Sequence, residues 1–189
     1  MNRQLLIAGL LGGLAMYLWT FLAHMALPLG EAGIRQIENE QPLLAQMKTT
    51  LPSQGMYMFP RMSPGQDQQQ YMQNIATGPS GLLMYFPRRD FNFGTSLIIE
   101  FLSEMVQALI ITWLLSLTRL ATFTSRAGFF ATAGLAAALT TNVSYWNWYG
   151  FPTTYTAAYM FTNWMGYLCA GLAVAALMSR QTKRRAAAA

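Results

Sequence analysis

The chain has little of what soluble enzymes and disulfide-bonded proteins depend on. Its 189 residues include one cysteine, Cys169, and one histidine, His24, and only 10% of them are charged. A single cysteine excludes an intramolecular disulfide, a Cys-x-x-Cys redox pair and a cysteine-based metal cage. Soluble domains are about 25% charged, so the low charge indicates a chain built largely for an apolar environment.

Four long apolar stretches account for this composition. They are residues 4–27, 95–117, 127–145 and 156–178. Each can cross a bilayer core about 30 Å thick as a helix rising about 1.5 Å per residue. The first is longer than a signal-peptide core and has no clean small-x-small cleavage site after it, so we expect it to be retained. The predicted fold class is an all-α membrane protein, a bundle of four transmembrane helices.

Basic residues are distributed unevenly around these spans. The side shared by the amino terminus, the second connection and the tail has no acidic residue and seven basic ones: Arg3, Arg119, Arg126, Arg180, Lys183, Arg184 and Arg185. The positive-inside rule places that side in the cytoplasm. We therefore expect a multi-pass protein of the cytoplasmic (inner) membrane with both termini cytoplasmic. Its partner is the lipid bilayer, and no basic surface interleaved with aromatics suggests nucleic acid.

The connection between the first two spans, residues 28–94, is too long for a structureless link. It carries five basic and five acidic residues, so its net charge is zero. Its charge is therefore compatible with a position outside the membrane. We predict a small α+β extracytoplasmic cap inserted between helices 1 and 2. One helix should begin at Pro42, and a second should have Ser63 as N-cap and end at Gly78.

Two aromatic segments in this connection, 55–61 and 81–88, are typical of short strands ended by proline. Their order around a helix permits a parallel pair, and an antiparallel pair stays open. The predicted organisation of the whole chain is a first transmembrane helix at 1–27, the cap at 28–94, helices 2–4 with a basic tail at 95–185, and an alanine tail at 186–189.

Polar residues inside the spans are the main functional signal, because they are expensive in hydrocarbon. Glu100, Glu104 and Gln107 recur at helical spacing on one face of the second span. His24, Asn142 and Asn163 lie at comparable depths in the other spans. These six residues are the predicted ligand- or ion-binding pocket, with Glu104, the deeper acid, paired to Asn163, Gln107 or a ligand.

Other interpretations of the same residues stay open. The polar side chains could simply tie helices together. No metal site is predicted, because there is one histidine and no Glu-x-x-His motif of the di-iron bundles. No catalytic residue is predicted either, since no nucleophile motif occurs. The sequence leaves cofactors unknown and favours a non-enzymatic protein.

An aromatic connection is predicted to follow the third span at the outer membrane surface, where rings with polar tips are favoured. It consists of Trp146, Asn147, Trp148 and Tyr149. The favoured function is an accessory or assembly protein that docks a partner, either another membrane protein or a second copy, through the cap and this aromatic loop. The alternative is a transporter, channel subunit or small-ligand binder that uses the pocket around Glu100 and Glu104.

Overall fold

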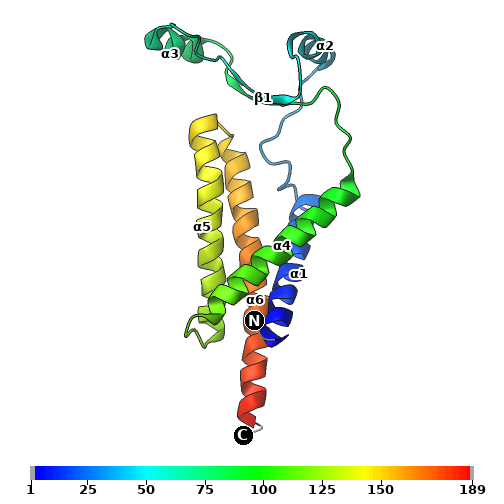
Figure 1. Ribbon diagram of the computed structural model, residues 1–189, viewed down its shortest axis with the longest axis vertical. Coiled ribbons are helices and arrows are strands. Elements are labelled where there is room, and N and C mark those ends of the chain that lie inside the picture. The colour runs from blue at the N-terminus through cyan, green and yellow to red at the C-terminus, as the bar shows by residue number, and fades with distance from the viewer. Residues whose placement is uncertain (1–2, 188–189) are drawn as a thin grey trace. The chain divides into compact units, whose positions relative to one another are not determined.

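The computed structural model describes residues 3–187, with side chains described up to Arg180. The described chain is mostly helical and contains one small sheet (Figure 1). The elements in chain order are α1 (Arg3–Met25), α2 (Gln41–Thr50), β1 (Gly55–Phe59), α3 (Gln68–Thr77), β2 (Gly81–Tyr85), α4 (Phe93–Ser116), α5 (Phe123–Tyr149) and α6 (Thr153–Ala187). The predicted basic and alanine tail falls largely outside the described side chains.

The chain divides into two compact units. The helical unit contains α1, α4, α5 as far as Asn147, and α6. The small unit consists of Arg35–Phe91 together with Trp148–Gly150. Each unit is considered by itself below.

Three described helices are long and apolar enough to cross a membrane: α1, α4 and Thr153–Arg180 of α6. Their length and apolarity agree with the predicted membrane class. The third predicted span corresponds to α5, which is helical over 27 residues but is not among these three. Its alanine, glycine and threonine residues make it less apolar than the others, so the structure supports three of the four predicted spans on this criterion.

Two helix ends are set by local chemistry. The helix α4 begins at Phe93 because the Asn92 side chain accepts a hydrogen bond from the Thr95 amide at 2.9 Å, an N-cap. The helix α5 continues to Tyr149 and stops at Gly150, whose φ is +69°. Trp146, Asn147, Trp148 and Tyr149 therefore form the last turn of α5, and their prediction as a loop is wrong.

Small residues let α1 approach its neighbours closely. A Cβ added at Gly13 would lie 2.8 Å from the Cα of Met105 on α4, and one added at Gly12 would lie 2.8 Å from Val174 Cγ2 on α6. Such close backbone approach is how helices pack in lipid, where burial of apolar surface gives no driving force. The glycines of the first span therefore serve packing within the bundle.

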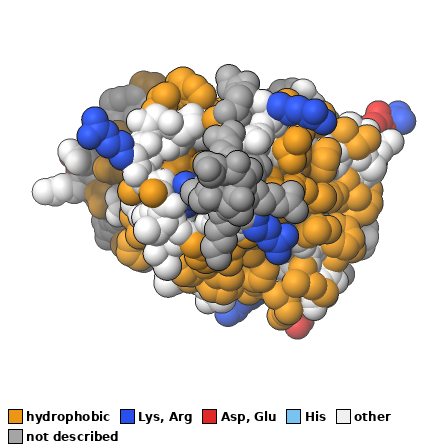
Figure 2. All heavy atoms as spheres, turned by 90° about the horizontal axis from the view of Figure 1, so that it is seen from below, with side chains coloured by type: hydrophobic (Ala, Val, Ile, Leu, Met, Phe, Trp, Pro, Cys, Tyr) orange, Lys and Arg blue, Asp and Glu red, His pale blue; other side chains and the backbone are white. Residues whose placement is uncertain are grey.

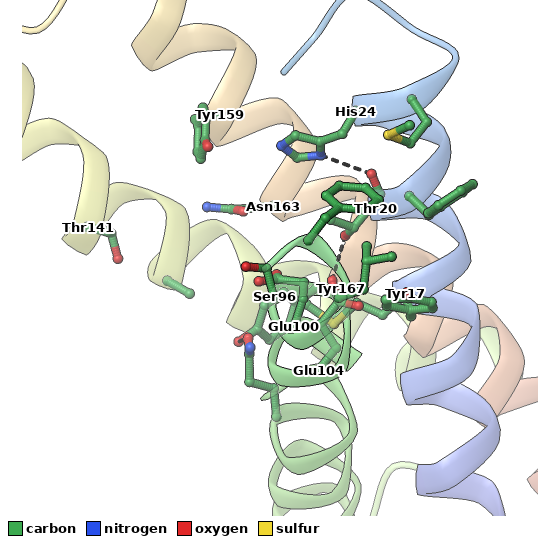
Figure 3. A pocket seen from close by; sticks show the side chains of 17 residues that line it. Tyr17, Thr20, His24, Ser96, Glu100, Glu104, Thr141, Tyr159, Asn163 and Tyr167 are labelled. Carbon is green, nitrogen blue, oxygen red and sulfur yellow. Dashed lines mark hydrogen bonds between the residues drawn. The ribbon is translucent and has the colours of Figure 1, made fainter. Parts of the chain in front are cut away.

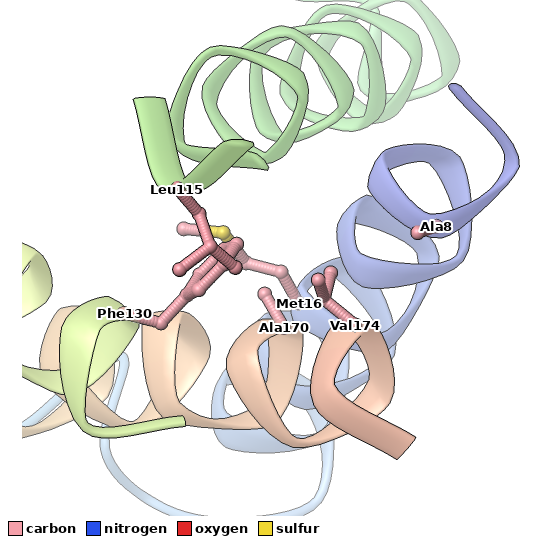
Figure 4. Packing of buried hydrophobic residues seen from close by; sticks show 6 residues of the cluster. All are labelled: Ala8, Met16, Leu115, Phe130, Ala170 and Val174. Atoms are coloured by element: carbon pink, nitrogen blue, oxygen red, sulfur yellow. The ribbon is translucent and has the colours of Figure 1, made fainter. Parts of the chain in front are cut away.

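All four helices of this unit contribute to one apolar core (Figure 4). Its members are Ala8, Met16, Leu115, Phe130, Ala170 and Val174. Phe130 of α5 is fully buried, which ties α5 to the other three helices. Many of the large apolar side chains on α1 and α4 point outward instead and are exposed, and Figure 2 shows apolar side chains covering wide areas of the face in view.

In the small unit, α3 begins later than predicted. Its N-cap is Asp67, whose carboxylate accepts hydrogen bonds from the amides of Gln69 and Gln70 at 3.1 and 3.3 Å. Ser63 was the predicted cap, and its amide does donate to Gln66 Oε1 at 3.0 Å. That contact closes a turn ahead of the helix, because Gly65 has a φ of +78° and interrupts helical geometry.

The two strands pair antiparallel, which settles the orientation that the sequence left open. Gly55 is opposite Tyr85, and Phe59 is opposite Gly81. Successive side chains in a strand point to opposite faces. One face of the sheet therefore carries Tyr57 and Tyr85, whose rings meet edge to face at 6.4 Å.

Candidate polar pocket of the helical unit

A pocket of about 480 Å³ lies among the four helices of the helical unit (Figure 3). Its polar lining comes from Thr20, His24, Ser96, Glu100, Glu104, Gln107, Thr141 and Asn163. Its aromatic lining comes from Tyr17, Phe21, Phe93, Tyr159 and Tyr167. Five of the six residues predicted from the sequence as pocket residues are thus in its wall.

Glu104 of α4 is the most buried acid in this wall. Its side chain is 2% exposed, and its Oε1 accepts a hydrogen bond of 2.6 Å from the hydroxyl of Thr20 on α1. Its other oxygen, Oε2, is buried and has no hydrogen-bond partner among the residues that the structure describes. One carboxyl oxygen is therefore satisfied by the protein, and the other is buried without a partner among the described residues.

The predicted partners of Glu104, Asn163 and Gln107, are not the ones observed. Gln107 is held by a different residue of α6, because its Oε1 accepts a hydrogen bond of 2.9 Å from the hydroxyl of Tyr167. Its Nε2 donates to Ser103 Oγ at 3.0 Å on the same helix. Gln107 thus links α4 to α6, as the polar-glue interpretation expects of such side chains, while Glu104 links α4 to α1.

Thr20 joins two of the predicted residues. Its hydroxyl donates to Glu104, and its backbone carbonyl lies 2.9 Å from Nδ1 of His24 (Figure 3). When Nδ1 carries the proton and donates to this carbonyl, Nε2 is the free acceptor of the ring. The His24 ring also meets Tyr159 edge to face, with centroids 6.1 Å apart.

Asn142 is the predicted residue that the structure does not bring into the pocket. It is buried, and its Nδ2 donates to the carbonyl of Ala138 at 3.0 Å in its own helix. The neighbouring Thr141 lines the pocket instead. Adjacent residues on a helix point about 100° apart, and here that step turns Asn142 away from the wall to which Thr141 contributes.

Sequence reasoning missed four residues of the wall: Thr20, Thr141, Tyr159 and Tyr167. Thr20 lies four residues before His24, and Tyr159 and Tyr167 lie four before and four after Asn163. Residues four apart share a helix face. The spacing could have pointed to them, but threonine and tyrosine are common enough in membrane helices that they were not singled out.

Of the predicted aromatic residues, Trp146 donates from its indole nitrogen to the hydroxyl of Thr153 at 3.1 Å. This bond holds the end of α5 against the start of α6. Trp148 is 78% exposed, which is unusual for so large an apolar side chain. Trp148 is therefore available for contact with lipid or protein.

The two acidic residues in the pocket wall, Glu100 and Glu104, have no lysine or arginine beside them there. Glu100 is exposed and one turn from Glu104. Such a wall attracts cations and hydrogen-bond donors and repels anions. Among the described residues, no group of three His, Cys, Asp or Glu side chains is placed to hold a metal ion.

The helical unit thus combines three helices long and apolar enough to cross a membrane with an aromatic-lined pocket that contains two acidic residues. Comparison with protein-family models, curated proteins and solved structures finds no match for the chain.

Proposed function

We propose that this chain spans the cytoplasmic membrane four times and binds a small cationic ligand in the pocket around Glu104. In this proposal the helix α5 is the third of the four spans, both termini are cytoplasmic, and the small unit is extracytoplasmic. The absence of acids on the basic side of the sequence supports this orientation. The core residue Phe130 supports α5 as a member of the bundle, because it is fully buried among the other helices.

The unpartnered oxygen of Glu104 carries the proposal. A buried carboxylate oxygen without a hydrogen bond costs free energy, and about 1–3 kcal/mol is typical for a buried polar group. A ligand that donates an N–H bond would remove this cost. No donor of the described protein reaches Glu104 Oε2, and the proposal assigns that donor to the ligand.

The rest of the wall fits an ammonium group. Aromatic faces attract cations, and five aromatic side chains line the cavity. Its volume of about 480 Å³ also lies within the range of about 300–1,000 Å³ typical of small-molecule sites. A primary ammonium ion therefore meets the charge of the pocket and supplies the N–H donor, and a small-ligand transporter or binder is the class of activity that follows.

The test uses the full chain in nanodiscs of phosphatidylglycerol, which excludes lipids with ammonium headgroups. Titration calorimetry with ethylamine, which is a primary ammonium ion at neutral pH, should show saturable binding to the wild-type protein. Glu104→Gln keeps the Thr20 hydrogen bond but removes the charge, so it should abolish this binding. Asp67→Asn changes an exposed acid of the small unit and should leave it unchanged.

The two possible sources of the ligand give different results in a second set of nanodiscs. If a lipid headgroup occupies the pocket, phosphatidylethanolamine discs should suppress ethylamine binding. If the ligand is a free amine, the two lipids should give the same affinity. Absence of saturable binding to the wild type in phosphatidylglycerol, or unchanged binding to Glu104→Gln, would contradict the proposal.

The orientation is tested by cysteine labelling in a Cys169→Ala background. An impermeant maleimide added outside should label Gln70→Cys and should reach Lys183→Cys only after the membrane is opened. The reverse pattern would overturn the proposed topology.

A second candidate function is an accessory or assembly protein that docks a partner. The exposed apolar side chains of the small unit favour it, among them Met56, Met84, Phe86, Phe91 and Trp148. This candidate predicts that a partner protein or a second copy copurifies equally well with the wild type and with Glu104→Gln. The pocket proposal instead predicts that a small ligand copurifies with the wild type and not with Glu104→Gln.

A further inference from the structure

One face of the small sheet carries an exposed cluster of methionines. Met56 and Met58 lie on β1 and Met84 on β2, and they are 66%, 48% and 65% exposed. Met56 and Met84 are direct partners in the register. The opposite face holds the tyrosines and is the better covered one, since Tyr85 is buried. The methionines therefore do not serve the packing of the sheet.

The register brings the three thioethers within reach of one another. Direct cross-strand partners have Cβ atoms about 4.5–5.5 Å apart, and diagonal neighbours remain within reach of long side chains. Met56 and Met58 are two residues apart and share a face. Met58 is opposite Leu82, so it is diagonal to Met84 across the sheet. Unbranched methionine side chains can converge from such positions.

We propose that Met56, Met58 and Met84 form a binding site for a soft monovalent cation, Cu(I) or Ag(I), with three thioether ligands. Thioether sulfur selects Cu(I) over the harder divalent ions, which prefer oxygen or imidazole. The site lies entirely within the small unit and is separate from the pocket at Glu104, so it stands or falls independently of the function proposed for that pocket.

The composition of the small unit supports an all-sulfur site. The only cysteine and the only histidine of the chain, Cys169 and His24, are both in the helical unit. A Cu(I) ion at the sheet therefore meets no thiolate or imidazole there. Since a thioether has no proton to lose, affinity should be the same at pH 5.5 and at pH 7.5, whereas sites with cysteine or histidine weaken in acid.

The experiment titrates the purified full-length protein in detergent with Ag(I), and with Cu(I) kept reduced by ascorbate against a chromophoric chelator. A Cys169→Ala background removes the thiol. One ion per chain should bind. Replacing any one of the three methionines by leucine, which keeps volume and apolarity, should weaken binding by at least about tenfold, or about 1.4 kcal/mol.

Met72→Leu is the matched control, because Met72 is also exposed, at 56%, but lies on α3 outside the sheet. It should leave the affinity unchanged. Circular dichroism should be the same for all variants. Bound Ag(I) should also protect Met56, Met58 and Met84, but not Met72, from oxidation by peroxide to the sulfoxide, as mapped by mass spectrometry.

The site would be overturned by a lack of stoichiometric binding to the background protein, by equal weakening in Met72→Leu, or by affinity that falls in acid. Retained affinity in all three leucine variants of the sheet would do the same. In that case the methionine face would be an apolar contact surface for lipid or protein, which leucine maintains and which needs no sulfur.

Discussion

The Thr20–Glu104 hydrogen bond should contribute measurably to the stability of the bundle. Thr20→Val keeps the shape of the side chain and removes the only hydroxyl that donates to Glu104 in the described structure. The carboxyl, 2% exposed, then has neither oxygen paired by the protein. A buried acceptor left unpaired costs about 1–3 kcal/mol, while hydrogen bonds between membrane helices average about 0.6 and reach about 1.7 kcal/mol. We expect the free energy of unfolding to fall by about 1–2 kcal/mol.

Glu104→Leu should cost less than the loss of a full buried hydrogen bond, because it also removes the unpartnered Oε2. In the double variant, the two losses should not add. The coupling energy of the cycle should be about 0.6–1.7 kcal/mol in favour of the intact pair. Reversible unfolding by sodium dodecyl sulfate in mixed micelles, followed by circular dichroism, measures all four proteins.

Thr112→Val is the matched control for this cycle. Thr112 is also a fully buried threonine of the bundle, but its hydroxyl has no partner among the described residues. Replacing an unsatisfied hydroxyl by a methyl of the same shape should leave stability unchanged or raise it. A coupling energy below about 0.3 kcal/mol for Thr20 and Glu104, the range of independent sites, would refute the pairing on which the pocket depends.

Two further substitutions test the packing and the capping. Gly13→Ala should lower the free energy of unfolding by about 1–3 kcal/mol, because the new Cβ meets the Met105 backbone. Gly128→Ala should not lower it, because a Cβ added there meets nothing within 4 Å. Equal stability of the two variants in the same unfolding assay would contradict the close approach of α1 and α4. Asp67→Ala should reduce the helicity and protease resistance of the small unit, at a cost of about 0.5–2 kcal/mol, and Ser63→Ala should not; the opposite order would restore Ser63 as the cap.

The membrane helices could be predicted because their signal is strong and local. Apolar length and few charges define α1, α4 and α6 without reference to any other part of the chain. The glycines of α1 likewise predicted close packing. The third span is the weak case: α5 is helical and contributes Phe130 to the core, but its composition is closer to the limit between a buried helix and a membrane span.

The sequence could predict that polar residues of the four helices lie at a similar depth, but it could not predict which of them contact each other. Helical spacing placed Glu100, Glu104 and Gln107 on one face, and the structure puts all three in the pocket wall. Depth alone could not separate Asn142 from Thr141, since one step along a helix changes the face. The partner of Glu104 depends on how α1 is rotated against α4, which the one-dimensional pattern does not encode.

The N-cap of α3 was predicted at the wrong residue, Ser63, because the local pattern did not show where the chain turns. Ser63 and Gln66 match the capping-box pattern, and their contact does form. A glycine at position 65 adopts a positive φ and turns the chain, so a helix cannot follow directly. Asp67, a good N-cap residue two positions later, then provides the actual start.

The most direct test of the pocket is to identify the molecule that stays bound when the protein is released from its own membrane. Native mass spectrometry of the full chain released from membrane vesicles should show a bound small molecule with a basic nitrogen on the wild type and on Glu38→Gln, and none on Glu104→Gln. The same small molecule on all three proteins, or none on the wild type, would contradict a cationic ligand held by Glu104.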